Sequence, residues 1–309
     1  MINTVRINCP LCGSDNSKPV ACGPDFEYNS SDQEFRVVEC LDCGLMYLNP
    51  RPDISELNKI YPSEYIPCQF ANYLPAIVNS ARMRVQKEKV KAVKKLVEEG
   101  AVIFDVGCGD GIFLDCLRTL GRDNWKLTGI DISKNAIDQI RKKGFQGICG
   151  RFEELAGYDG YADVIVLNQV IEHLEDPLGV AAKASDMLKK GGFIFIETPS
   201  IEGWDSKLFR KRYWGGWHFP RHWSFFSSKT INLLLSKSGF RLVRQEWLLS
   251  PNFWAQSIHH FLSEKKGFSL LEKQFDCSNF LTMAFFSAVD TVQKMFGKTS
   301  NMRVIGQKI

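Results

Sequence analysis

Short apolar runs alternate with amphipathic stretches between residues 101 and 250. Continuous apolar runs predict strands at 101–106, 126–131, 146–149, 162–167 and 192–197. Apolar residues recur at helical spacing between and after these runs, at 111–120, 133–143, 177–190 and 229–238. Strands that are apolar on both faces and separated by helices indicate a parallel sheet covered on both sides. The pattern predicts an α/β fold with a doubly wound open sheet, in which ligands bind beyond the carboxyl ends of the strands.

The segments on either side of this body follow other patterns. A first long helix is expected over 81–98, and strand-like alternation appears at 240–249 and again at 301–308. The intervening segment, 252–298, is predicted to be a helical insertion, because its apolar residues recur at helical spacing: Leu281, Phe285, Ala288, Val289, Val292 and Phe296. Core packing or a homodimer face explains this spacing, and a peripheral membrane-surface helix is the alternative.

Two cysteine pairs with Cys-x2-Cys spacing precede the body, each followed by glycine: Cys9 and Cys12, then Cys40 and Cys43. Each pair can present two thiolates to one ion from a tight turn, and four sulfurs make a closed tetrahedral zinc site. Four cysteines leave no open coordination position, so we expect a structural Zn²⁺ that folds a small ribbon over 1–48. Strand-like runs at 5–7 and 35–39 lead into the pairs. Prolines and aromatic residues in 49–80 indicate an extended linker packed on the next domain.

We therefore divide the chain into a zinc ribbon at 1–48, a linker at 49–80, the sheet domain at 81–250, and the insertion with a final antiparallel strand at 251–309. Composition is that of a globular protein, with 44% hydrophobic and 24% charged residues. No secretory signal or bilayer-length apolar run is evident, so we expect a cytoplasmic protein, with the inner membrane face as the alternative. Residues 1–80 carry 5 basic and 10 acidic side chains, which disfavours a nucleic-acid partner for the ribbon.

A glycine-rich turn follows the first predicted strand of the body and opens a helix, at residues 105–111. Its spacing is G-x-G-x-G, and Ile112 stands where a dinucleotide fingerprint would continue. Asp131 ends the second predicted strand, where a carboxylate can accept hydrogen bonds from both ribose hydroxyls. Asp105 would repel a pyrophosphate but favours a cationic sulfonium and an ammonium group. These features predict binding of S-adenosyl-L-methionine (SAM).

The segments 105–111 and 168–177, with Asp131, resemble the class I SAM-dependent methyltransferases. The cysteine head, 48–52 and 219–222 resemble a bacterial subgroup with an N-terminal four-cysteine zinc ribbon. The resemblance implies a seven-stranded Rossmann-like sheet and methyl transfer to a small-molecule, sugar or lipid-linked acceptor. It assigns cofactor contacts to Asp105, Gly107, Cys108, Gly109, Gly111, Asp131, Ile132, Phe152 and Asn168. Arg151 stands where the family commonly has an Asp for the adenine amine, and Glu153 is the candidate substitute.

Two groups of residues are candidates for the acceptor side. His173, with Glu172 beside it, lies beyond the fourth predicted strand, where a neutral imidazole can act as a general base. A packing histidine is the alternative, as is a share in a divalent-metal site of the kind found in the ubiquinone-pathway O-methyltransferases that this motif resembles. The segment 209–226 combines aromatic residues, glycines and cations. We interpret it as a substrate lid with His218, Arg221 and His222 facing an acceptor phosphate or carboxylate, or else as an aromatic packing segment.

The acceptor itself is not fixed by these motifs, because oxygen, nitrogen and carbon nucleophiles share this fold. A methyltransferase acting on protein or nucleic acid is one alternative, although the chain reads Asn-Gln-Val-Ile from Asn168 where nucleic-acid base methylation favours Asn/Asp-Pro-Pro-Tyr. A non-catalytic SAM-binding scaffold is another. Turnover of SAM distinguishes the scaffold from an enzyme.

Overall fold

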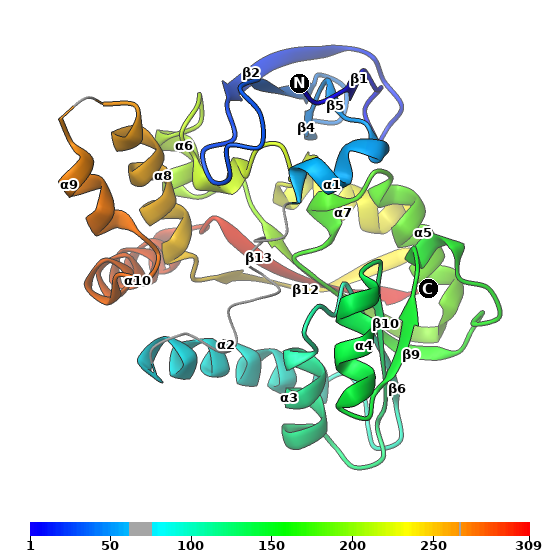
Figure 1. Cartoon of the computed structure of the whole chain (residues 1–309). Helices are drawn as coiled ribbons and strands as arrows, with labels where there is room; N and C mark the ends of the chain where they lie inside the picture. The colour runs from blue at the N-terminus through cyan, green and yellow to red at the C-terminus, as the bar shows by residue number, and fades with distance from the viewer. Residues whose placement is uncertain (62–75, 266) are drawn as a thin grey trace.

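A seven-stranded mixed sheet lies at the centre of the molecule (Figure 1). The computed structural model describes residues 1–61, 76–265 and 267–309. The strand order is β12-β13-β10-β9-β6-β7-β8. In chain order the strands are β6 (Val102–Val106), β7 (Lys126–Asp131), β8 (Gln146–Cys149), β9 (Ala162–Asn168), β10 (Leu188–Pro199), β12 (Phe240–Leu248) and β13 (Asn301–Lys308). β13 runs antiparallel to both of its neighbours, which confirms the predicted final strand.

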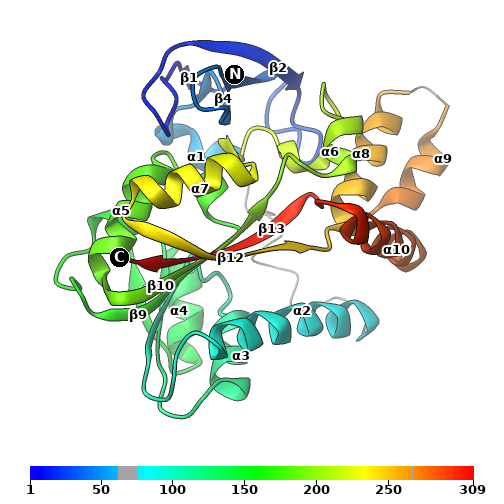
Figure 2. The same ribbon diagram turned by 180° about the vertical axis from the view of Figure 1, so that it is seen from behind.

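Helices cover both faces of this sheet, as the apolar strands predicted. One face packs against α2 (Ala76–Lys94), α3 (Ile112–Leu120) and α4 (Lys134–Lys142), whose buried residues form a core with Ile103, Val164 and Phe195. The other face packs against α5 (Pro177–Met187) and α7 (Ser228–Lys237). Figures 1 and 2 show the N-terminal head above the α5 and α7 side, with α2 to α4 on the opposite side.

Two element boundaries differ from those expected from sequence. β10 begins at Leu188, whereas its apolar run begins at Gly192, and the pairing with β9 shifts register between Leu188 and Phe193. The polar and glycine residues in this irregular stretch hide it from an apolar pattern. α2 begins at Ala76, before the expected start at 81. Residues 62–75 of the predicted linker lie outside the described part of the chain.

The N-terminal head contributes two small sheets. One has the order β11-β4-β3-β2 and contains β2 (Ser17–Gly23), β3 (Phe35–Cys40), β4 (Met46–Leu48) and β11 (Ser224–Phe225). The other pairs β1 (Thr4–Val5) with β5 (Arg51–Pro52). A short η1 (Ile54–Glu56) and α1 (Leu57–Ile60) follow. Because β11 comes from the segment between β10 and β12 of the central sheet, the body supplies the fourth strand of the head's sheet.

The segment 209–226 is a packing element that joins the head to the body. It contains η6 (Gly215–Trp217), and its aromatic side chains are buried with apolar residues of the head: Trp214, Trp217, Phe219, Trp223 and Phe225. The lid interpretation is therefore corrected, because a segment that supplies a shared core is held in place on both sides. Of the two readings of these aromatics, packing is the one observed.

The predicted helical insertion is present between β12 and β13. It consists of α8 (Pro251–Ser263), α9 (Ser269–Glu272), η7 (Lys273–Phe275) and α10 (Phe280–Phe296), and it projects from one side of the sheet (Figures 1 and 2). Phe286 and Trp254 stack at a ring distance of 5.7 Å where α10 rests on α8. Across the described residues, no helix combines the length and apolar character required to span a bilayer.

Candidate active site

The glycine turn sits at the carboxyl end of β6, between the strand and α3. Gly107, Gly109 and Gly111 all have positive φ, which favours glycine at each position. A Cβ atom on Gly107 would lie 2.5 Å from Val170, and one on Gly111 would lie 2.6 Å from Ile140, so packing alone demands glycine at both. At Gly109 nothing lies within 4 Å of such a Cβ. Gly109 is thus the position where the backbone is open to a ligand.

Asp131 holds the glycine turn in register with the next strand. Its carboxylate accepts hydrogen bonds from the backbone N–H groups of Gly109 (3.0 Å) and Ser133 (2.8 Å). Ile132 follows it with 67% of its surface exposed, which is unusual for an isoleucine beside a sheet edge and suits a flat ligand. Cys108 differs from the other expected contacts, because its thiol is buried in the core and its N–H donates to the carbonyl of Ile130 (3.2 Å).

The expected adenine side is built around η4 (Phe152–Glu154). Phe152 is buried and belongs to the main core. Arg151 forms an ion pair with Glu153 (2.5 Å) and another with Glu175 (3.5 Å). The guanidinium of Arg151 thus neutralises the acidic side chain that we considered as the adenine contact.

A buried lysine from α2 reaches the same edge of the sheet. The Nζ atom of Lys89 donates to the Asn168 side-chain oxygen (2.8 Å) and lies 3.0 Å from a Glu197 carboxylate oxygen. Burial raises the pKa of Asp105 to about 7, while the positive charge of Lys89 acts in the opposite direction. Lys89 was not predicted as a site residue from the sequence, because a single lysine in a lysine-rich helix is expected to be exposed to solvent. Only the packing of α2 shows that this side chain is buried at the site.

His173 and Glu172 lie in η5 (Ile171–His173), directly beyond β9. The Nδ1 atom of His173 lies 3.1 Å from the carbonyl oxygen of Arg221 and 3.0 Å from the Tyr61 hydroxyl. A carbonyl only accepts, so Nδ1 carries the proton and Nε2 presents its lone pair. Burial and the nearby charge of His218 lower the pKa of His173 to about 3, which keeps the ring neutral.

Glu172 and His222 complete a cluster with His173. The ring centres of the two histidines are 4.6 Å apart, and the Nδ1 atom of His222 donates to the Gly216 carbonyl (2.9 Å). Glu172 accepts a hydrogen bond from Thr198 (3.0 Å) with one carboxylate oxygen, and its other oxygen is buried with no hydrogen-bond partner among the described residues. One ligand atom from each of Glu172, His173 and His222 lies within 4.8 Å of the others, so the cluster could take a proton or a divalent cation.

Arg221 is placed differently from the expected acceptor contact. Its guanidinium is fully buried and makes two parallel bonds with the Asp25 carboxylate, at 3.0 and 2.8 Å. It also lies 4.3 Å from the ring centre of Tyr28. His218 pairs with Glu27 at 2.6 Å. Both side chains therefore bind acidic residues of the head. The ring centre of His218 also lies 4.9 Å from that of His222 and 6.3 Å from that of His173, whereas Arg221 contributes only its carbonyl to this cluster.

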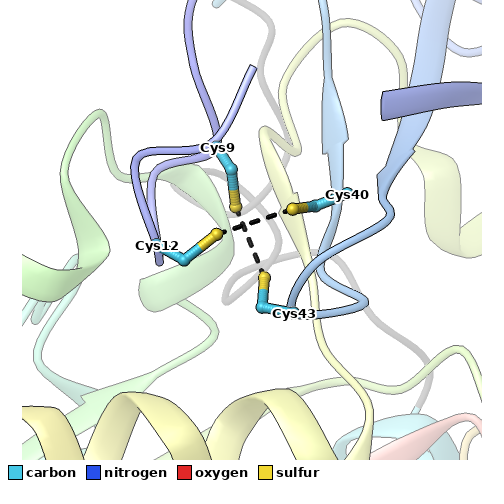
Figure 3. Close-up of side chains that lie close together, drawn as sticks. All are labelled: Cys9, Cys12, Cys40 and Cys43. Carbon is cyan, nitrogen blue, oxygen red and sulfur yellow. Dashed lines mark hydrogen bonds between the residues drawn. The ribbon is translucent and has the colours of Figure 1, made fainter. Parts of the chain in front are cut away.

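The four head cysteines converge from their two turns (Figure 3). The sulfur atoms of Cys9 and Cys43 are 3.5 Å apart, as are those of Cys12 and Cys40, and all four lie within 4.8 Å of one another. Sulfurs around a tetrahedral zinc ion are roughly 3.8 Å apart, given Zn–S bonds of about 2.3 Å. The donor set and its spacing therefore fit the predicted ion.

Comparison with known proteins places the sheet domain in one family. The description "Methyltransferase domain" matches residues 81–245. The ubiquinone biosynthesis O-methyltransferases of Thiobacillus denitrificans and Bordetella avium are 30% and 31% identical over 106 and 107 residues. These matches cover 32% of this chain and 44% and 43% of the two relatives, so the chain spans less than half the length of either. An uncharacterised protein of Methanocaldococcus jannaschii is 26% identical over 160 residues, 52% of this chain and 74% of its own.

The fold also recurs among solved structures. The Haloferax volcanii structure described as a complex of the Trm112 methyltransferase activator with a methyltransferase aligns with a TM-score of 0.50 and 17% identity. The alignment covers 74% of this chain and 93% of that one. At this identity the likeness shows a shared fold.

The buried Asp25–Arg221 pair generates a prediction about stability. Asp25→Asn would leave a buried guanidinium without its anion, and we expect the free energy of unfolding at pH 7 to fall by about 3–5 kcal/mol. Asp15→Asn, at an exposed position of the head, is the matched control and should change it by less than about 0.5 kcal/mol. Urea unfolding followed by tryptophan fluorescence measures both. An Asp25→Asn value within about 1 kcal/mol of the wild type would contradict the prediction.

The Asp25–Arg221 pair also predicts how the free energy of unfolding depends on pH. Burial raises the pKa of Asp25, but the bonds and charge of Arg221 outweigh it and lower the pKa to about 2. The folded value is below the unfolded one of about 3.9, so the stabilisation is complete above pH 4 and is lost as pH falls toward 2. The difference in the free energy of unfolding between the wild type and Asp25→Asn should therefore decrease as the pH falls from 4 toward 2.

Proposed function

Because the chain belongs to the methyltransferase-domain family, within the class I SAM-dependent methyltransferases, we propose that it transfers the methyl group of SAM to a small-molecule acceptor. The observation that carries the proposal is a juxtaposition. The glycine turn at the end of β6 and the Glu172–His173–His222 cluster at the end of β9 lie at the carboxyl edge of two neighbouring strands. A bound methyl donor and an acceptor would meet at that edge.

The cofactor would lie across the ends of β6 and β7. Asp131 would accept hydrogen bonds from the ribose hydroxyls, and Gly109 would allow the methionine part to approach the backbone. Asp105 would face the ammonium group, which a carboxylate attracts. We assign the methionine carboxylate to the Nζ atom of Lys89, since it is buried beside Asn168 at the same edge.

Methyl transfer is an in-line displacement, in which the C–S bond breaks as the acceptor atom bonds to the methyl carbon. The acceptor must be aligned with that bond, and a hydroxyl acceptor must also lose its proton. We propose that His173 takes this proton through Nε2, since Nδ1 already donates to the Arg221 carbonyl. Because burial lowers the pKa of His173, the negative charge that develops on the acceptor oxygen would have to stabilise the imidazolium. The observed cluster supports a second arrangement, in which Glu172, His173 and His222 hold a divalent cation that orients the acceptor.

We infer the acceptor class from the names of the relatives and from the ion pairs that Arg221 and His218 make with the head. The matched relatives are named as O-methyltransferases of ubiquinone biosynthesis, which favours a small or lipid-linked acceptor with a hydroxyl nucleophile. Sugar acceptors belong to the same proposal. Arg221 pairs with Asp25, and His218 with Glu27, so the expected cations of this segment are engaged by the head, which weighs against their use for a nucleic-acid backbone.

We also propose that the four head cysteines bind one structural Zn²⁺. Thiolate charges at this spacing repel one another, and a divalent cation would offset that repulsion. The ion would fix the turn before β2 to the turn that connects β3 and β4. Since β4 pairs with β11 next to His222, a folded head is needed to place the acceptor-side cluster.

The proposed function is tested by following the labelled methyl group. Purified protein, methyl-labelled SAM and a cell extract should give S-adenosylhomocysteine and label in the small-molecule or lipid fraction. His173→Gln should lower the rate at least about 100-fold with little change in SAM affinity. His259→Gln, on α8 and outside the cluster, is the control. Label in the protein or RNA fraction would favour the macromolecular alternative, and SAM binding without turnover would favour the scaffold.

The cation arrangement is tested in the same assay. If Glu172, His173 and His222 hold a divalent ion, EDTA treatment short enough to leave the proposed head zinc bound, as checked by elemental analysis, removes the activity, and Mg²⁺ or Mn²⁺ restores it. His222→Gln should then raise the metal concentration needed for half-maximal rate. Full activity after EDTA treatment would show that the reaction needs no divalent cation, and would leave proton transfer to His173 as the proposed role of the cluster.

The assignment of Lys89 is tested with two ligands. Lys89→Met should weaken SAM binding about 10–100-fold, the range expected for a lost charge-assisted bond. Binding of 5′-methylthioadenosine, which lacks the amino-acid part, should not change. Lys91→Met, which removes an exposed lysine paired with Glu88, is the matched control. Titration calorimetry measures the affinities; an equal loss for both ligands would assign Lys89 a purely structural role.

The zinc proposal predicts one zinc per chain by elemental analysis. Cys12→Ser should lower the zinc content and reduce the free energy of unfolding by several kcal/mol, because metal binding contributes to folding. Cys149→Ser, at an exposed position outside the head, should retain the ion. Full zinc occupancy in Cys12→Ser would show that the ion binds elsewhere.

A further inference from the structure

The helix α10 exposes a continuous apolar stripe that the proposed methyl transfer does not use. Its large members have exposed fractions between 48% and 77%, and small residues lie between them. The stripe, named here the α10 stripe, consists of Leu281, Ala284, Phe285, Ala288, Val292, Met295 and Phe296. These positions follow the three- and four-residue spacing of one helix face, and none of them carries charge.

The opposite side of α10 is already occupied. Phe286, Asp290 and Gln293 are buried, and the Asp290 carboxylate accepts a bond from the Trp254 indole on α8 (3.0 Å). The helix is therefore held on the protein by its polar and aromatic face, which leaves the apolar face outward. This is the reverse of the usual orientation for a surface helix.

The size of the α10 stripe is that of a protein interface. A whole aromatic side chain has roughly 200 Å² of surface, so these exposed fractions leave about 700 Å² of apolar surface in the stripe. Apolar patches on monomeric proteins rarely exceed about 300–600 Å², and a standard interface buries about 800 Å² per partner. Two copies of the stripe placed together would bury more than the roughly 1,000 Å² that a specific interface needs.

The spacing of residues along the stripe is complementary to that of a second, antiparallel copy of the same stripe. Leu281 and Phe296 lie equally far from the midpoint between Ala288 and Val289, and so do Phe285 and Val292. In an antiparallel pair related by a twofold axis at that midpoint, Leu281 would meet Phe296 of the other copy. Phe285 would meet its Val292, and the small Ala288 would lie at the crossing point, where the backbones are closest.

We propose that α10 pairs with the α10 of a second chain, antiparallel and about this midpoint, to form a homodimer. A membrane surface fits the helix less well, because interfacial helices present lysine and arginine on a solvated polar face. α10 has one basic residue, Lys294, and its polar Asp290 and Gln293 are buried against the protein.

The register is tested by a charge pair in the full-length protein. Phe285→Lys and Val292→Glu should each weaken the dimer at least about 100-fold, because each places a charge at the centre of an apolar interface. The double variant should regain most of the affinity, since each lysine would then face the glutamate of the other copy. Lys294→Glu, outside the stripe, is the matched control. Sedimentation velocity measures the fraction at twice the 35.1 kDa chain mass.

Two results would overturn the proposal. One is a wild-type protein that remains monomeric at about 100 µM, which is concentrated enough to reveal even a weak dimer. The other is a dimer that Phe285→Lys leaves unchanged. Flotation with vesicles of phosphatidylglycerol and phosphatidylcholine provides the membrane alternative: wild-type flotation that Phe285→Lys abolishes, without dimerisation, would assign the stripe to lipid. Retained SAM binding confirms that each variant is folded.

Discussion

The buried ion pair between Asp25 and Arg221 is the interaction on which the acceptor side depends. It joins residues 196 positions apart, one in the head and one in the segment between β10 and β12. Burying two charges is costly unless each meets the other with good geometry, and here two parallel bonds provide it. Because this pair fixes the side chain of Arg221, the main-chain carbonyl of Arg221 is also held in place. That carbonyl accepts the hydrogen bond that orients His173. A contact between the head and the segment that follows β10 thus holds in place the carbonyl that bonds to His173 in the candidate active site.

The head is consequently part of the active-site structure. The turn of Cys9 and Cys12 precedes β2, and the turn of Cys40 and Cys43 connects β3 to β4. β4 pairs with β11, and β11 begins two residues after His222. Tyr61, which follows α1, places its hydroxyl 3.0 Å from His173. The head and the sheet domain share one aromatic core, so they cannot move independently without exposing it. The acidic residues Asp25 and Glu27 of the head pair with Arg221 and His218, two basic side chains of the segment 209–226.

The sequence predicted the parts that depend on local patterns. The strands, the glycine turn and the two cysteine pairs follow from periodicity and spacing, which neighbouring residues determine. It misplaced Arg221, since a cation in a ligand-side loop gives no sign of a carboxylate 196 positions earlier. It missed Lys89, because burial of one lysine in a helix depends on how that helix packs. Periodicity did identify the apolar spacing of α10, but only the structure shows that the apolar face is outward.

The burial of the Glu172 carboxyl group is energetically unfavourable. One of its oxygens is bonded to Thr198, and the other is buried without a hydrogen-bond partner among the described residues, beside two neutral imidazoles. Burial raises the pKa of Glu172 to about 8, so the carboxyl is held in an environment that disfavours its charge. An apolar side chain of similar volume would avoid this cost. Unfavourable burial of polar groups is concentrated at functional sites, where a ligand supplies the missing partner. The incomplete hydrogen bonding therefore points to the end of β9, where His173 and His222 also present their unprotonated nitrogens.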